Sequence, residues 1–105
     1  MDLDVLRRAP LFATLDDDVF AALTKELTEV ELSRGSSVFH EGDQGDQLYV
    51  VASGKIKLGR STPDGRENLL AVLGPGEIFG EMALFNPAPR TASATAVSET
   101  RLAGL

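Results

Sequence analysis

The sequence has no cysteine, and His40 is its one histidine. Without cysteine, the chain cannot form disulfides, iron–sulfur clusters, thiolate zinc sites or a cysteine nucleophile. A metal site built from several histidines is excluded as well. A lone histidine beside the turn Glu41-Gly42-Asp43 is far more often structural or exposed than a ligand, so we expect no metal there.

Positive charge is also scarce, since ten Lys and Arg residues stand against sixteen Asp and Glu, for a net charge of -6. Nucleic-acid modules usually carry a basic face, and this chain as a whole would repel a phosphate backbone. An anion would have to be bound by a local cluster of donors. The apolar runs are too short for a transmembrane helix, and the start, MDLDVLRRAP, lacks the features of an export signal. We therefore expect a cytoplasmic protein without a membrane partner.

What is present suits a single globular domain of 105 residues, 43% of them apolar and 25% charged. About residues 1–28 are expected to be helical. A short helix over 1–8 should be ended by Pro10. A longer helix should begin near Thr14 or Asp16, where successive acids suit the positive end of the helix dipole and apolar residues then recur at helical spacing.

From residue 29 onward the apolar residues follow a period of two, which is typical of strands. Turn signals such as Arg34-Gly35 and Pro63-Asp64-Gly65 separate short apolar runs. Strands at intervals of roughly ten residues predict an antiparallel sandwich or barrel over about residues 29–105. The candidate strands include 29–32, 38–39, 48–51, 55–58, 69–73, 91–97 and 101–105.

One segment, residues 79–86, interrupts the strand pattern. It holds good helix formers between Gly74-Pro75-Gly76 and Pro87-Ala88-Pro89. We expect a short helix that opens at Gly80. The free N–H groups at the start of such a helix can face an anion.

The stretch from residue 79 to 93 combines a glycine that lets a backbone approach a ligand with a carboxylate, an arginine and a hydroxyl. It resembles the phosphate-binding cassette of the cyclic nucleotide-binding domains of Crp–Fnr transcription regulators. Gly80-Glu81 and Arg90-Thr91-Ala92 match the cassette's pattern of Gly-Glu, a few apolar residues, Arg-Ser or Arg-Thr, and Ala. Similar stretches at 39–43, 48–55 and 61–70 extend the resemblance over residues 11–105, and the last of them is similar to actinobacterial Crp-type regulators.

The resemblance implies a mainly β protein with N-terminal helices, in which an antiparallel jelly roll (a double-stranded β-helix) carries a short helix in the cassette. It also implies a cyclic nucleotide effector, cAMP before cGMP. Arg90 would hold the phosphate with its planar fork, and Thr91 would donate its hydroxyl. Backbone N–H groups at Gly80 would support the ribose–phosphate end, and Glu81 would accept from the ribose 2′-hydroxyl.

Each of these residues also has an ordinary explanation. Arg90 could pair with a surface acid, Glu81 could be a first-turn acid favoured by the helix dipole, and Thr91 could be a plain strand residue. Four weaker candidates lie at Met82, Ser93, Leu70 and Leu73. Met82 also suits the core, Ser93 shares the strand face of Thr91, and the two leucines would line the base only if the strand register turns them toward it.

The resemblance further implies that residues 1–105 are the sensor domain of a transcription regulator, whose ligand controls DNA binding allosterically. The dimerisation helix and helix-turn-helix domain that follow in this family are absent from the chain. DNA binding and the homodimer are therefore expected only of the intact regulator, and no enzyme activity is expected.

Two other interpretations stay open. The domain could be a Crp-like scaffold that binds no cyclic nucleotide, although its composition argues against an iron–sulfur or haem sensor. It could also be a cupin-like metalloenzyme, because small β-barrels of this kind often hold a metal. That site needs several histidine and carboxylate ligands, so stoichiometric iron, zinc or manganese would favour it.

Overall fold

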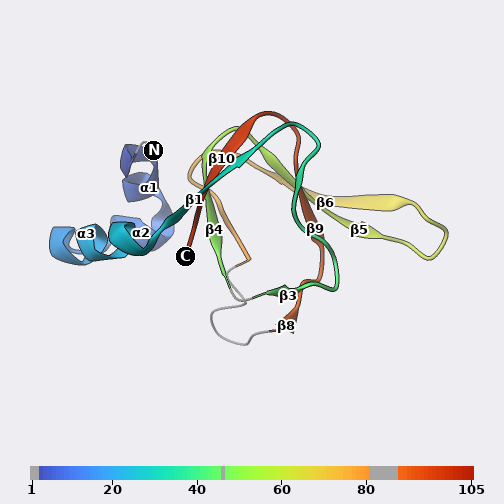
Figure 1. Cartoon of the computed structure of the whole chain (residues 1–105), viewed down its shortest axis with the longest axis horizontal. Helices are drawn as coiled ribbons and strands as arrows, with labels where there is room; N and C mark the ends of the chain where they lie inside the picture. The colour runs from blue at the N-terminus through green and yellow to red at the C-terminus, as the bar shows by residue number, and fades with distance from the viewer. Residues whose placement is uncertain (1–2, 46, 81–87) are drawn as a thin grey trace.

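Three short helices open the chain in the computed structural model, which describes residues 3–45, 47–80 and 88–105. They are α1 (Leu3–Arg8), α2 (Pro10–Ala13) and α3 (Asp17–Glu26), and they lie together at one end of the molecule (Figure 1). The first helix ends before Pro10 as predicted, but Pro10 also opens α2. A proline is tolerated at the first helical position because its missing N–H would have no partner there.

The start of α3 confirms the predicted position but not a side-chain cap. Asp16 is the N-cap in an extended conformation, and its side chain makes no capping hydrogen bond. Asp17 and Asp18 follow in the first turn. The acids therefore act there through the helix dipole.

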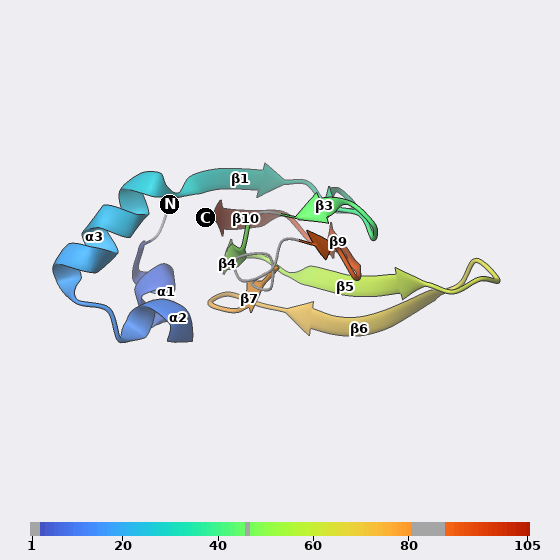
Figure 2. The same ribbon diagram turned by 90° about the horizontal axis from the view of Figure 1, so that it is seen from below.

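The rest of the described chain is antiparallel β structure, as predicted. One sheet has the strand order β1-β10-β4-β7, a second has β2-β9-β5-β6, and a short third one pairs β3 with β8. Figures 1 and 2 show the sheets curving around a shared interior. The strands are β1 (Thr28–Leu32), β2 (Ser37–Phe39), β3 (Gln44–Gly45), β4 (Tyr49–Ser53), β5 (Ile56–Ser61), β6 (Glu67–Leu73), β7 (Ile78–Phe79), β8 (Ala88–Pro89), β9 (Ser93–Ala96) and β10 (Thr100–Gly104).

The predicted strand over 91–97 is shorter than expected. The chain leaves β8, which pairs with β3, and enters β9, which pairs with β2 and β5. Residues 91–92 make the bend between the two sheets, so they cannot continue a strand. Of the predicted helix over 79–86, Phe79 is the last residue of β7, Gly80 follows it, and residues 81–86 lie outside the described part.

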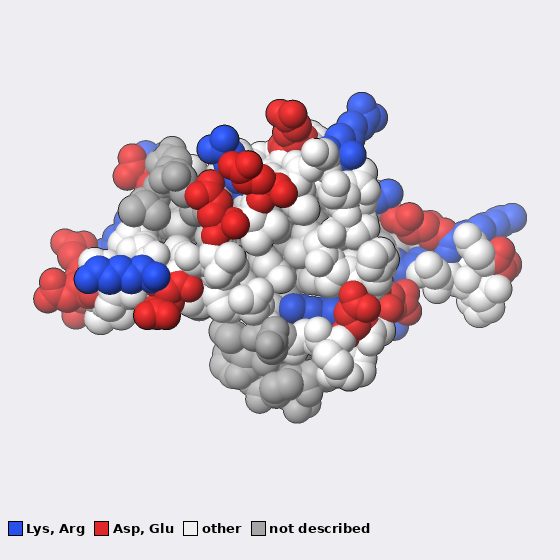
Figure 3. All heavy atoms as spheres, in the orientation of Figure 1, with Lys and Arg blue, Asp and Glu red and all other residues white. Residues whose placement is uncertain are grey.

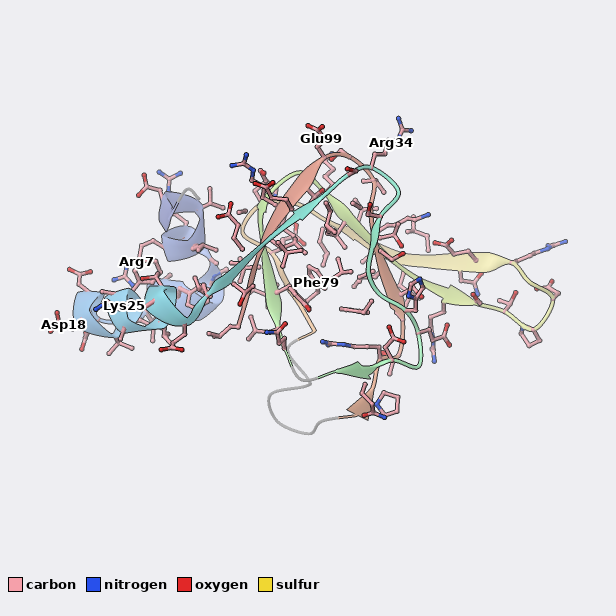
Figure 4. All side chains as sticks on the ribbon, viewed as in Figure 1. Arg7, Asp18, Lys25, Arg34, Phe79 and Glu99 are labelled. Atoms are coloured by element: carbon pink, nitrogen blue, oxygen red, sulfur yellow. The ribbon has the colours of Figure 1, made fainter. Side chains whose placement is uncertain are left out.

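Two apolar clusters hold the elements together. One joins the helices to the first sheet through Leu6, Ala9, Phe12, Leu48, Val50 and Ala103. The other fills the space between the sheets with Val51, Ile56, Phe79, Ala94, Ala96 and Leu102. Figure 4 shows Phe79 pointing into this interior. Alternate residues of β9 are buried, as a strand with one face on the core requires. In β4 the consecutive residues Val50 and Val51 are both buried, one in each cluster, so this apolar run is covered on both faces.

The β5–β6 hairpin projects from the body of the domain (Figure 2). Leu69, Leu70 and Val72 on β6 are 60%, 55% and 49% exposed. Leu58 pairs with Ala71 and the next residue, Gly59, pairs with Leu69, so Leu70 is the extra residue of a β-bulge. Beyond this bulge the hairpin extends past the core.

The hairpin tip is closed by the predicted turn. The Thr62 hydroxyl and the backbone N–H of Arg66 both donate to the Asp64 carboxylate. These hydrogen bonds, the hydroxyl first, hold the pKa of Asp64 below its ordinary value. The ionised carboxylate therefore stabilises the turn through these local hydrogen bonds.

Candidate functional site

The backbone of Arg90 is fixed by the turn between β2 and β3. Its N–H donates to the carbonyl of Asp43 at 2.6 Å, and its carbonyl accepts from the N–H of Gly42 at 2.8 Å. Just before it, the short strand β8 pairs with β3. Segments nearly fifty residues apart in the sequence thus determine where this side chain starts.

The guanidinium of Arg90 is held by two backbone carbonyls from two further segments. Nη2 donates to the carbonyl oxygen of Gln47 at 2.7 Å, and Nη1 donates to that of Gly80 at 3.3 Å. Both oxygens are uncharged acceptors. Within the described residues, the arginine is therefore oriented by neutral groups and not by a carboxylate.

An aromatic ring lies against the same guanidinium. The Cζ atom of Arg90 lies 4.2 Å from the ring centroid of Phe39, which is within cation–π range. Phe39 itself contacts Tyr49 and Phe79, with centroid distances of 6.2 and 5.9 Å. The arginine thus rests on the outer member of an aromatic cluster that belongs to the core between the sheets.

Two glycines make room for the arginine. A Cβ atom on Gly45 would lie 2.5 Å from Cζ of Arg90, and one on Gly80 would lie 2.7 Å from Nη1. Gly80 also has a φ of 77°, which disfavours any residue with a side chain. A close approach of backbone to guanidinium is therefore built into both positions.

One nitrogen of this guanidinium makes no hydrogen bond to the described residues. Nε of Arg90 is buried and has no hydrogen-bond partner among the residues that the structure describes. None of the ion pairs within 3–45, 47–80 and 88–105 involves Arg90 either. A buried N–H without a partner costs free energy, and an anion would relieve that cost. A positively charged group that lacks an acceptor is chemically suited to an anion.

The structure brings together two of the four main predicted residues, Arg90 and Gly80. Thr91 is exposed in the bend directly after Arg90. Glu81, with the weaker candidate Met82, lies outside the described residues. The structure therefore describes the two ends of the cassette, where the guanidinium of Arg90 donates to the carbonyl of Gly80. The contact predicted for Gly80, from its backbone N–H to a ligand, is a different one.

The other weaker candidates have separate positions. The Ser93 hydroxyl accepts from the backbone N–H of Glu41 at 2.8 Å, so it is already used by a turn. Leu73 packs against the core cluster between the sheets. Leu70 occupies the bulge of the exposed hairpin. Of the two leucines, the register turns only Leu73 toward the barrel interior.

Sequence reasoning missed three residues around the arginine, namely Phe39, Gly45 and Gln47. The loop that carries Gly45 superficially resembles a calcium loop, but it lacks the spacing of one, so its composition indicates only a turn. Its real neighbour is a segment that starts more than forty residues later. A backbone carbonyl such as that of Gln47 leaves no signal in residue type, so pattern reading could not have found it.

No cluster of three or more potential metal ligands (His, Cys, Asp or Glu) occurs within the described ranges. On the face drawn in Figure 3, acidic and basic side chains of the described residues are interspersed without a broad basic area. A hollow of about 530 Å³ beside β1 and β10 is lined by Glu31 and Glu99 as well as Arg101. It shares no lining residue with the Arg90 site, and its two carboxylates would repel a phosphate.

Comparison with known proteins identifies the family of this chain. Residues 29–105 match the family described as "Cyclic nucleotide-binding domain". The "CRP-like cAMP-activated global transcriptional regulator" of Mycobacterium tuberculosis is 51% identical over 98 residues, which are 93% of this chain and 44% of that protein. The "Cyclic AMP receptor protein" of Thermus thermophilus is 44% identical over 95 residues, covering 83% of this chain and 44% of that protein.

A solved structure is similar over almost the whole chain. The N-terminal domain of a transcriptional regulator from Streptomyces coelicolor A3(2) shares 60% sequence identity with a TM-score of 0.91, covering 97% of this chain and 71% of that one. The chain spans less than half the length of the two curated relatives. None of the described helices is long and apolar enough to cross a membrane. This chain belongs to the cyclic nucleotide-binding domain family, with close homology to the CRP-like regulators.

Proposed function

We propose that this domain binds cAMP and that Arg90 is the ligand of its cyclic phosphate. The buried, unpartnered Nε of Arg90 carries the proposal. A phosphodiester oxygen supplies the missing acceptor, and the positive charge of the guanidinium meets the single negative charge of the phosphate. The match to the family and the names of the relatives from Mycobacterium and Thermus support cAMP as the nucleotide.

The remaining cassette residues have proposed roles around the same ligand. Thr91 donates its hydroxyl to the phosphate, and the backbone at Gly80 supports the ribose–phosphate end. Glu81 accepts from the ribose 2′-hydroxyl and repels a phosphate placed there. A linear 5′-monophosphate carries about one charge more than a cyclic phosphodiester, so it is disfavoured beside this carboxylate.

Calorimetric titration with cAMP, cGMP and 5′-AMP tests the proposal. We expect saturable binding of cAMP, weaker binding of cGMP, and no binding of 5′-AMP in the same concentration range. The Arg90→Leu variant should lose the cAMP signal while remaining folded. Absence of binding by all three nucleotides, or equal binding by the variant, would contradict the proposal.

We further propose that residues 1–105 act as one sensor domain of a CRP-like transcription regulator. Binding of cAMP would favour one arrangement of the cassette and thereby control DNA binding by a helix-turn-helix domain of the homodimeric regulator. The test is a chimera in which this chain replaces the matching residues of the Mycobacterium relative. DNA binding by the chimera should depend on cAMP, and DNA binding that ignores cAMP would contradict this step.

A further inference from the structure

We propose that Phe39 is a positioning residue, which holds the guanidinium of Arg90 ready for an anion without neutralising its charge. The geometry of the pair carries this inference, and its consequence for affinity rests on the proposed function of the site. The ligand chemistry that it serves is a phosphodiester monoanion.

Phe39 is placed rigidly enough for this role. It ends β2 and pairs with Ala94 of β9 across the sheet. Its half-buried ring contacts Tyr49 and Phe79, and the last two rings stack with a centroid distance of 5.3 Å. The ring cannot turn away from Arg90 without disturbing this cluster.

The ring and the two carbonyls constrain Arg90 in different directions. Hydrogen bonds from Nη1 and Nη2 to the carbonyls of Gly80 and Gln47 restrict the guanidinium within its own plane. The Phe39 ring, whose centroid lies 4.2 Å from Cζ, supports the guanidinium from the side and limits its tilt. With one side chain restricted in both ways, less rotational entropy remains to be lost when a ligand binds.

A ring is also the right chemistry for an anion site. A carboxylate would hold Arg90 as firmly, but it would cancel the charge that the phosphate needs. The ring attracts the cation through its quadrupole. It accepts no hydrogen bond in the plane of the guanidinium, where the N–H groups point. Nε therefore keeps its unused N–H, with no acceptor among the described residues.

The chain contains a matched control for this contact. Cζ of Arg7 lies 4.9 Å from the ring centroid of Phe20, which is half-buried like Phe39. Arg7 lies among the helices (Figure 4) and pairs with Asp17. Phe20→Leu thus removes an aromatic ring from beneath an arginine outside the proposed site.

The first experiment measures cAMP affinity in four variants by calorimetry. Phe39→Leu should weaken binding by about 2- to 30-fold, the range of a partly to fully desolvated cation–π contact. Phe20→Leu should leave the affinity unchanged. In the Arg90→Lys background, Phe39→Leu should cost less than in the wild type, because the two residues act as a unit. An equal loss of cAMP affinity in both backgrounds would overturn the proposal. If Phe39 had only a structural role, the effects of its substitution and of Arg90→Lys on the binding free energy would simply add.

The second experiment needs no nucleotide, so it separates this inference from the proposed function. The Nε–Hε resonance of Arg90 in the ligand-free ¹⁵N-labelled chain is identified by its loss in Arg90→Lys. Phe39→Leu should shift it by removing the ring-current field and should speed its exchange with water, whereas Phe20→Leu should do neither. An unmoved resonance overturns the proposal. A moved resonance in a protein that binds no cAMP supports the positioning by Phe39 and contradicts the proposed function instead.

Discussion

Two arginines in this domain are held in nearly the same way, at opposite parts of the chain. Arg7 donates to the backbone carbonyls of Phe12 and Leu15 at 2.8 and 2.6 Å and lies over a phenylalanine ring. Arg90 also donates to two backbone carbonyls and lies over a phenylalanine ring. Position on a ring and on carbonyls therefore does not by itself distinguish a structural arginine from a binding one.

The difference lies in the charge that surrounds them. Arg7 has a carboxylate partner, Asp17, at 3.0 Å. Arg90 has no ion-pair partner in the part of the chain that the structure describes, and its Nε is buried without an acceptor. Arg7 is paired with a carboxylate of its own fold, whereas Arg90 is oriented by neutral groups and keeps one nitrogen without a partner among the described residues. That incompleteness, rather than the residue type, points to a ligand.

The sharpest test of this comparison replaces each arginine by leucine. Arg90→Leu should weaken cAMP binding at least about 30-fold, equivalent to ~2 kcal/mol, because a partly desolvated charge-assisted contact is lost. Arg7→Leu should bind cAMP like the wild type, measured by calorimetry under the same conditions. Comparable affinity losses in the two variants would remove the distinction between the arginines.

The next largest effect is expected from the space around Arg90. Gly45→Ala should weaken cAMP binding and lower the free energy of unfolding by about 1–3 kcal/mol, because the added methyl group would overlap the guanidinium. Urea unfolding and calorimetry on the same sample measure both quantities.

Gly74→Ala is the matched control for that substitution. Gly74 does not have a positive φ, and a Cβ atom there would meet nothing within 4 Å. The control should keep its affinity, and it should lose less stability than Gly45→Ala. A Gly45→Ala variant with wild-type affinity would show that the close approach of Gly45 to Arg90 is not needed for binding.

The contrast also explains what the sequence could predict. Helical and strand periods are local, so N-terminal helices followed by antiparallel strands were predictable. The two-residue strands β3, β7 and β8 were not, because so short a stretch shows no period. Arg90 and Gly80 could be proposed as site residues because their family pattern is local too. Phe39, Gly45 and Gln47 were not found, because they meet Arg90 only through the pairing of β3 with β8 and of β2 with β9.

Pro10 and the bend at 91–92 show a second limit of local patterns. A proline signals a helix boundary, but the same residue suits the end of one helix and the start of the next. Residues 91–92 have strand composition, yet the chain changes sheets there. In both cases tertiary connection decides between two structures that local chemistry allows.

A smaller effect should appear at the structural arginine. Arg7→Leu should reduce the free energy of unfolding by about 1–2 kcal/mol, because two carbonyl hydrogen bonds of the helical region are lost. Chemical denaturation monitored by far-UV circular dichroism measures the change. An unchanged midpoint of unfolding would mean that Arg7 does not stabilise the helices. Arg7 could then not serve as the structural arginine in the comparison with Arg90.

The smallest effect concerns Asp17, the carboxylate partner that distinguishes Arg7 from Arg90. The side chain of Asp17 is 97% exposed, so its ion pair with Arg7 is screened by water and salt. Asp17→Asn should change stability by no more than about 0.5 kcal/mol, with the difference shrinking at high salt, and should leave cAMP affinity unchanged. The hydrogen bonds of Arg7 to Phe12 and Leu15 would then carry its structural role, and the carboxylate would only neutralise its charge. Asp17→Asn could instead lower the free energy of unfolding as much as Arg7→Leu does. The ion pair with Asp17 would then be what fixes Arg7. Two carbonyls and a ring would not be enough to fix Arg90, which has no carboxylate partner among the described residues.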